Sequence, residues 1–248
     1  MSEVKKLTVF GHITELRKIL VRSVIAVAIG AVVAFIFYDW IFYILILPAE
    51  GINLIYIEMT EMIGTIMRVC LIAGIMLAMP YLVYLGISFV APALTGKEKK
   101  YVYLILPWIA LMFAAGVVFG YFILVPPATR FLLTFGSDIA TPQIKIGNYI
   151  AIITRLLLSI GLVFEMPVIT TFLARIGVLK ARWLSSRRKT AIIVAFILAA
   201  LITPTFDPIN QSLVAIPLIV LYEMSIWLAK LVQRKEVDVA KSAASPTS

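Results

Sequence analysis

The chain contains a single cysteine, Cys70, and a single histidine, His12, among its 248 residues. One cysteine excludes an intramolecular disulfide and a thiolate metal cluster. The sequence also lacks the H-E-x-x-H, G-x-S-x-G and G-x-x-x-x-G-K-[ST] motifs. Hydrolysis and phosphoryl transfer therefore have no candidate residues, and we expect neither enzyme activity nor a metal or organic cofactor.

Charged residues are also scarce, at 14%, while 62% of the residues are hydrophobic. A helix needs roughly 20 mainly apolar residues to cross a bilayer. The sequence predicts a single all-α polytopic membrane domain over residues 1–232, and a polar, disordered cytoplasmic tail over 233–248. The first apolar run is too long for a removable signal peptide, so we expect a mature N-terminus. Six transmembrane helices are predicted, at about 20–38, 66–90, 101–124, 149–174, 189–204 and 209–229.

Basic residues are distributed unevenly between the two sides of this six-helix arrangement. Because loops rich in lysine and arginine stay in the cytoplasm, both termini are predicted to be cytoplasmic. The net charge of +9 then reflects orientation and attraction to anionic lipid, and no nucleic-acid site is expected. Of the 22 basic residues, 18 fall on the predicted cytoplasmic side, in the segments 5–22, 97–100, 175–189 and 230–241.

Two longer outer loops are predicted. The first, Asp39–Thr65, mixes polar and apolar residues and is expected to form short surface helices. The second, Val125–Asn148, opens with Pro126-Pro127 and is rich in turn signals, so we expect a compact cap.

Glu165 lies well inside the apolar run Tyr149–Ala174. An acidic side chain near the centre of a membrane helix costs roughly 2.5 to 3.5 kcal/mol and is a functional candidate. Pro167 leaves the carbonyl of Val163 without its helical partner, so a bend is expected. Arg155 is ten residues away, about 15 Å of helix, and cannot neutralise Glu165. Three interpretations remain open: a proton relay, a polar surface for a passenger chain, and a carboxyl group that only supports packing.

The last two predicted helices are short. Only 13 residues separate Lys189 from Thr203, about 20 Å of helix against a hydrocarbon core of about 30 Å. In the turn that follows, Asp207 can cap the last helix and Pro208 suits its first position. Gln211 is then expected at lipid depth, with an amide that requires a partner.

Two carboxylates lie in predicted cytoplasmic elements. Glu15 belongs to an amphipathic helix and shares a face with His12. It could simply pair with Lys18 or Arg22 at helical spacing. Glu98 stands three residues after Thr95, which is the spacing of a capping box.

Several motifs in order resemble those of the TatC family, the C subunit of the twin-arginine protein translocase. The resemblance covers nearly the whole chain. Its motifs are His12-Ile13-Thr14-Glu15-Leu16-Arg17, Phe89-Val90-Ala91-Pro92-Ala93-Leu94 with Glu98, Phe164-Glu165-Met166-Pro167, Leu201-Ile202-Thr203-Pro204 through Asp207 and Gln211 to Ala215-Ile216-Pro217, and Leu221-Tyr222-Glu223. One departure is that residues 61–68 lack the aromatic side chains expected there, and Arg68 replaces a common lysine.

The resemblance implies a receptor that binds the paired arginines of signal peptides on folded precursor proteins. The family's signal-binding carboxylates correspond to Glu15 and Glu98, and two carboxylates suit two guanidinium groups. The residues implied to shape this site are His12, Leu16, Arg17, Phe89, Pro92 and Leu94.

The resemblance also implies single-span A-type and B-type partner subunits docked on the last helices, at Thr203, Asp207 and Gln211. It places Glu165 on the concave face of the helix arrangement. Transport is then driven by the proton motive force across the inner membrane, within a larger self-associated complex. The alternative from the residues alone is a proton-coupled transporter of small solutes that uses Glu165.

Overall fold

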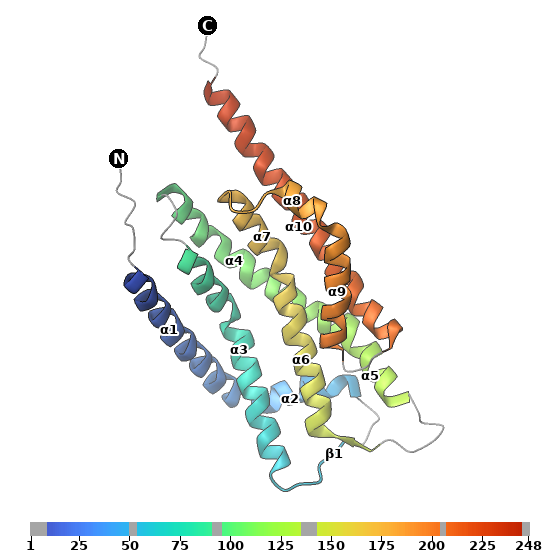
Figure 1. Cartoon of the computed structure of the whole chain (residues 1–248). Coiled ribbons are helices and arrows are strands. Elements are labelled where there is room, and N and C mark those ends of the chain that lie inside the picture. The colour runs from blue at the N-terminus through green and yellow to red at the C-terminus, as the bar shows by residue number, and fades with distance from the viewer. Residues whose placement is uncertain (1–8, 50–53, 91–95, 135–142, 204–206, 245–248) are drawn as a thin grey trace. The chain divides into compact units, whose positions relative to one another are not determined.

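The structure is a computed structural model that describes residues 9–49, 54–90, 96–134, 143–203 and 207–244 (Figure 1). The chain folds as two compact units, Met1–Gly161 and Leu162–Ser248. Nearly all described residues are helical, with five helices long and apolar enough to cross a membrane and a shorter one at Arg188–Ile202 where the sequence predicts a sixth. The predicted all-α membrane fold with six helices is therefore confirmed.

The first unit carries most of the long helices. Its elements are α1 (Val9–Ile36), α2 (Tyr38–Ile46), η1 (Leu47–Ala49), β1 (Leu54–Ile55), α3 (Glu61–Val90), α4 (Gly96–Phe119), η3 (Gly120–Leu124), α5 (Val125–Thr134), β2 (Ile144–Lys145) and α6 (Ile146–Phe164), whose last turn enters the second unit.

Helices α1 and α3 pack side by side because two glycines let their backbones touch. A Cβ atom placed on Gly30 would lie 2.6 Å from the carbonyl oxygen of Gly74, closer than real Cβ contacts allow. The two helices run in opposite directions. The start of α1, the end of α3 and the start of α4 consequently lie at the same end of this unit (Figure 1).

At the other end of the first unit, two tyrosines bind the end of α2. The hydroxyl of Tyr121 donates to the carbonyl oxygen of Ile44 at 2.8 Å, and that of Tyr149 donates to Leu45 at 3.1 Å. Both acceptors lie in the last turn of α2, where carbonyl groups have no intrahelical partner. The prediction of short helices in the first outer loop is confirmed.

The second outer loop differs from its prediction. Helix α4 continues through the π-helical turn η3 into α5, so the prediction of a loop was wrong for Val125–Thr134. Pro126 and Pro127 fall in the first turn after η3, where a missing N–H is tolerated. Residues 135–142 lie outside the described residues. Just beyond them, a short parallel strand pair that the sequence did not predict joins the two outer loops, with Leu54 opposite Ile144.

The second unit consists of α7 (Met166–Arg175), α8 (Ala181–Ser186), α9 (Arg188–Ile202) and α10 (Pro208–Ala244). Helix α7 ends because Gly177 adopts a left-handed conformation with φ of 74°. Helix α10 packs against α7, α8 and α9. The buried core at its α8 contact consists of Ala174, Ala181, Leu184, Ile226 and Ala229.

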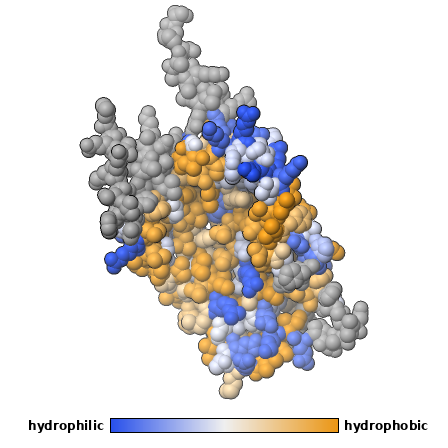
Figure 2. All heavy atoms as spheres, viewed as in Figure 1, coloured by the Kyte–Doolittle hydropathy of each residue, from blue (hydrophilic) through white to orange (hydrophobic). Residues whose placement is uncertain are grey.

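Five segments are long and apolar enough to cross a membrane, within the described residues: Thr14–Ile36, Glu61–Phe89, Ile105–Leu132, Ile146–Arg175 and Pro208–Gln233. Apolar side chains cover most of the face shown in Figure 2. The remaining predicted transmembrane helix, α9, has only 15 residues, about 22 Å, and is short as predicted. Helix α10, also expected to be short, has 37 residues because it continues beyond its apolar part into the range predicted as a tail.

Candidate functional site

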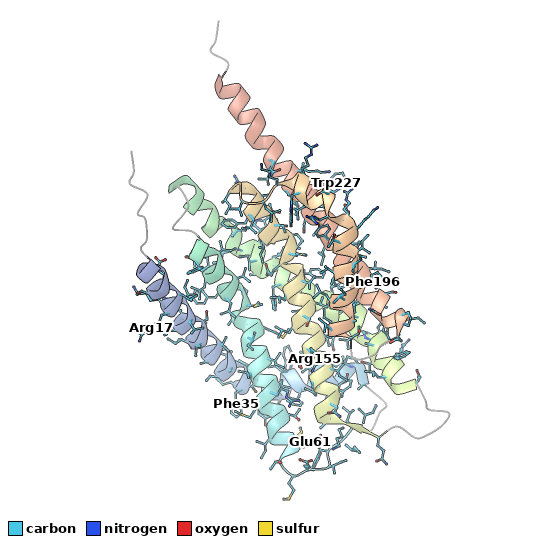
Figure 3. All side chains as sticks on the ribbon, in the orientation of Figure 1. Arg17, Phe35, Glu61, Arg155, Phe196 and Trp227 are labelled. Atoms are coloured by element: carbon cyan, nitrogen blue, oxygen red, sulfur yellow. The ribbon has the colours of Figure 1, made fainter. Side chains whose placement is uncertain are left out.

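Glu15 lies in the first part of α1 and is partly buried. Its Oε2 atom is buried and has no hydrogen-bond partner among the residues that the structure describes. Leu16 beside it is exposed. Arg17 is exposed as well (Figure 3). A buried acceptor without a donor is costly, so this oxygen is suited to accept a hydrogen bond from a ligand.

The end of α3 and the start of α4, which carry two other predicted signal-binding residues, lie at the same end of the first unit (Figure 1). Phe89 belongs to the last turn of α3, and Glu98 is the third residue of α4. This helical position agrees with the capping-box spacing, although Thr95 lies outside the described residues, as do Pro92 and Leu94. The side chains of His12 and Glu98 also lie outside the described part of the chain. The fold thus brings together the backbone segments of Glu15, Phe89 and Glu98.

Glu165 separates α6 from α7, so the predicted interruption of the helix is confirmed. The side chain is fully buried, and neither carboxyl oxygen has a hydrogen-bond partner among the described residues. Its backbone carbonyl accepts from the amides of Val168 and Ile169. The nearby hydroxyl of Thr170 donates to the carbonyl oxygen of Met166 at 2.8 Å. The carboxyl group therefore sits at a helix break where the described residues supply it with no donor.

Arg155 is exposed on α6 (Figure 3), ten residues before Glu165. Arg68 is exposed on α3. The side chains of both arginines therefore face the surroundings of the protein.

The start of α10 is capped as predicted. An Asp207 carboxylate oxygen, Oδ2, accepts from the backbone amide of Asn210 at 2.8 Å, and α10 begins at Pro208. Thr203 is buried at the end of α9 and donates to the carbonyl oxygen of Ala199 at 2.8 Å. Residues 204–206, which complete the turn, lie outside the described residues.

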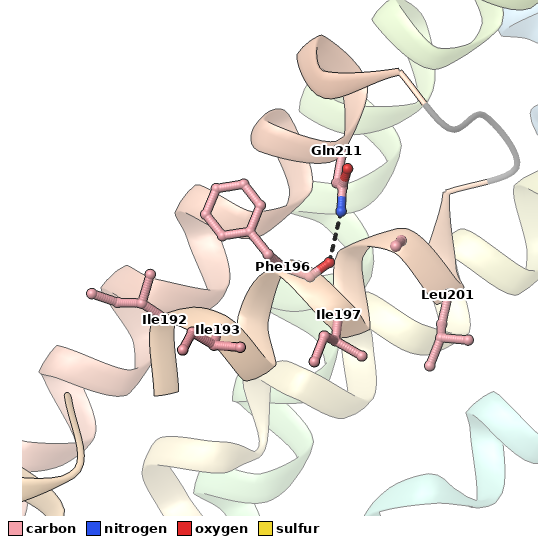
Figure 4. A pocket seen from close by; sticks show the side chains of 7 residues that line it. Ile192, Ile193, Phe196, Ile197, Leu201 and Gln211 are labelled. Carbon is pink, nitrogen blue, oxygen red and sulfur yellow. Dashed lines mark hydrogen bonds between the residues drawn. The ribbon is translucent and has the colours of Figure 1, made fainter. Parts of the chain in front are cut away.

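The side chain of Gln211 forms a hydrogen bond with α9. Its side-chain amide donates to the carbonyl oxygen of Phe196 at 2.9 Å (Figure 4). The same glutamine lines a pocket on the surface between α9 and α10, and is its one polar member. The apolar lining residues are Ile192, Ile193, Phe196, Ile197, Ala200 and Leu201.

From the sequence, the basic residues in 175–189 indicate only the orientation of the chain in the membrane. In the structure, Arg188 forms a two-pronged ion pair with Glu223, with Nε–Oε1 at 2.8 Å and a second nitrogen at 3.0 Å from Oε2. The clustering of arginines around Trp183 was the available signal. Within the described residues, no three His, Cys, Asp or Glu side chains gather as a metal site.

The chain is similar in sequence to known proteins. The chain matches the family model for the Sec-independent protein translocase protein TatC over residues 11–217. It is similar to the protein of that name from Carboxydothermus hydrogenoformans, with 42% identity over 94% of this chain and 97% of the relative. The TatC protein of Aquifex aeolicus is 37% identical, over 93% and 98% of the two chains.

A solved structure is also similar. A crystal structure of the twin-arginine translocase receptor TatC matches with a TM-score of 0.78 and 37% identity, covering 90% of this chain and 99% of the other. The similarity in sequence and in fold extends over nearly the whole chain, in agreement with the resemblance that the motifs predict.

Proposed function

The chain belongs to the TatC family of Sec-independent protein translocase proteins, and we propose that it is the receptor subunit of a twin-arginine translocase. In this role it binds the paired arginines in the signal peptide of a folded precursor protein. It is a multi-pass membrane protein. We propose that both termini lie in the cytoplasm and that the membrane is the inner membrane.

The observation that carries the proposal is the buried Oε2 atom of Glu15, which has no hydrogen-bond partner among the described residues. A guanidinium group presents up to five N–H donors and binds a carboxylate through two parallel hydrogen bonds, which an ammonium group cannot do. One arginine of the signal would satisfy Glu15. Glu98, on a helix that starts at the same end of the unit, would bind the second.

We propose that the pocket on α9 and α10 receives the transmembrane helix of a single-span partner subunit. Helix α9 is too short to span a core of about 30 Å, so a neighbouring helix would shield its ends. The apolar lining suits a membrane helix, and Gln211 provides a polar group at the edge of the contact. Asp207 caps the start of α10, which carries Gln211, and Thr203 closes the last turn of α9.

Glu165 would act after recognition, as a buried polar group that a signal or partner helix meets during transport driven by the proton motive force. Its burial without a donor among the described residues supports this role. Self-association with further copies would complete the translocation path.

The test is binding of the purified full chain to two matched signal peptides, one with Arg-Arg and one with Lys-Lys. We expect tighter binding of the Arg-Arg peptide, and loss of that preference in Glu15→Ala and Glu98→Ala. Glu58→Ala is the matched control, because Glu58 is exposed in the first outer loop. Equal binding of both peptides, together with unchanged binding in the two variants, would show that the receptor assignment is wrong.

A further inference from the structure

Helix α8 is held rigidly against α10. Its inward residues Ala181 and Leu184 are buried in the core with Ile226 and Ala229. The side chain of Gln233 binds on both sides of a backbone turn: its Oε1 accepts from the amide of Ala181 at 3.1 Å, and its Nε2 donates to Leu179.

Tyr222 adds a third hydrogen bond from α10 to the backbone of this region, because its hydroxyl donates to the carbonyl oxygen of Leu184 at 2.9 Å. These hydrogen bonds satisfy backbone groups on both sides of a helix of six residues. The outer face of α8 is therefore presented in one orientation.

That outer face combines an aromatic ring with positive charge. Trp183 is 56% exposed, and Arg182 and Arg187 are exposed beside it. The guanidinium carbon of Arg187 lies 6.0 Å from the centre of the Trp183 ring, within cation–π range. Lys189, at the start of α9, is also exposed.

The acidic side chains that the structure describes in this unit leave that charge uncompensated. They are Glu165, Asp207 and Glu223, while the side chains of Glu236 and Asp238 lie outside the described part of the chain. Glu165 is buried, Asp207 caps the start of α10, and Glu223 pairs with Arg188. Arg182, Arg187 and Lys189 therefore form, with Trp183, an exposed basic surface, which we call the α8 surface.

We propose that the α8 surface binds the phosphate headgroups of anionic phospholipids. Helix α8 connects the apolar helices α7 and α9, so it lies where both reach the membrane surface. Tryptophan favours that interface, and arginine binds phosphate through two hydrogen bonds. Charge complementarity identifies an anionic lipid as the occupant. The inference requires only that the chain is embedded in a membrane, and does not depend on the receptor function.

The experiment uses the full chain reconstituted in phosphatidylcholine bilayers with a trace of spin-labelled lipid. Electron paramagnetic resonance measures the fraction of labelled phosphatidylglycerol, or labelled phosphatidylcholine, that the protein immobilises. The variant is Arg182→Gln/Arg187→Gln/Lys189→Gln, which spares the Arg188–Glu223 pair. Arg68→Gln/Arg130→Gln/Arg155→Gln is the control, since it removes the same charge from exposed residues of the first unit.

We expect the unaltered protein to immobilise phosphatidylglycerol in preference to phosphatidylcholine. One basic side chain beside an anionic bilayer accounts for about a fivefold change in affinity, so the α8 variant should lose most of this preference and the control should retain it. An equal loss of the preference for phosphatidylglycerol in both variants would show that it depends only on the net charge of the protein, and would overturn the proposal. An unchanged preference in the α8 variant would also overturn it and favour an acidic protein partner. Loss of the preference on addition of inorganic phosphate at constant ionic strength would indicate a free-phosphate site instead.

Discussion

The carbonyl oxygen of Gly74 occupies the place that a side chain on Gly30 would need, since a Cβ atom there would lie only 2.6 Å away. This contact joins backbone to backbone, so a bulkier residue cannot be accommodated by rotating a side chain. It sets the separation of α1 and α3, and with it the position of Glu15 relative to the end of α3.

Gly30→Ala should therefore separate α1 from α3. We expect a loss of about 1 to 3 kcal/mol in stability, typical of overpacking, and weaker binding of the Arg-Arg signal peptide. Thermal unfolding in detergent and peptide titration measure the two effects. Gly86→Ala is the matched control on α3, because a Cβ atom there meets nothing within 4 Å. Equal stability of both variants would contradict the role of this contact.

Glu165→Gln keeps the shape of the side chain and removes the acid. We expect unchanged affinity for the signal peptide, because Glu165 does not belong to the segments that carry Glu15 and Glu98, together with loss of transport. Peptide titration and export in reconstituted vesicles separate the two steps. Unchanged transport would favour the packing interpretation, and proton-coupled uptake of a small solute lost in the variant would favour the transporter alternative.

Gln233→Leu removes two hydrogen bonds from the backbone around α8. Each backbone group left without a partner costs about 1 to 3 kcal/mol. We expect faster hydrogen exchange over residues 178–186, measured by mass spectrometry, with little change in α9. Lys230→Leu provides the comparison, because Lys230 is exposed on the same helix. Similar hydrogen exchange over residues 178–186 in the two variants would show that the hydrogen bonds of Gln233 do not stabilise this segment.

The Arg188–Glu223 pair should contribute little to stability despite its two-pronged geometry. The two side chains are 47% and 40% exposed, so solvent screens their attraction. A double-mutant cycle with Arg188→Gln and Glu223→Gln should give a coupling of about 0.2 to 1 kcal/mol that falls as salt is added. A coupling that does not change with salt would indicate that the pair is desolvated.

Much of the fold follows from patterns that act locally. The length of the apolar runs predicts the six helices, and the Asp207-Pro208 pair predicts the start of α10. Pro167 predicts the break at Glu165. Each depends on residues that follow one another along the chain, which is why the sequence suffices.

The continuation of α4 into α5 was missed because Pro126 and Pro127 signal a turn when taken alone. The π-helical turn before them changes the hydrogen-bond pattern that they must fit. The partner of Gln211 could not be predicted either, since the carbonyl oxygen of Phe196 becomes available to it only when α9 and α10 pack.

The sequence by itself determined that the chain is a six-helix membrane protein of the TatC type with carboxylates at Glu15, Glu98 and Glu165, because hydropathy, basic residues and motif order are properties of the linear chain. Tertiary structure alone decided which atoms remain unsatisfied and which surfaces remain charged. Distances between residues far apart in sequence decide that Oε2 of Glu15 has no partner among the described residues. They also decide that Gln233 binds the backbone around α8 and that Glu223 pairs with Arg188.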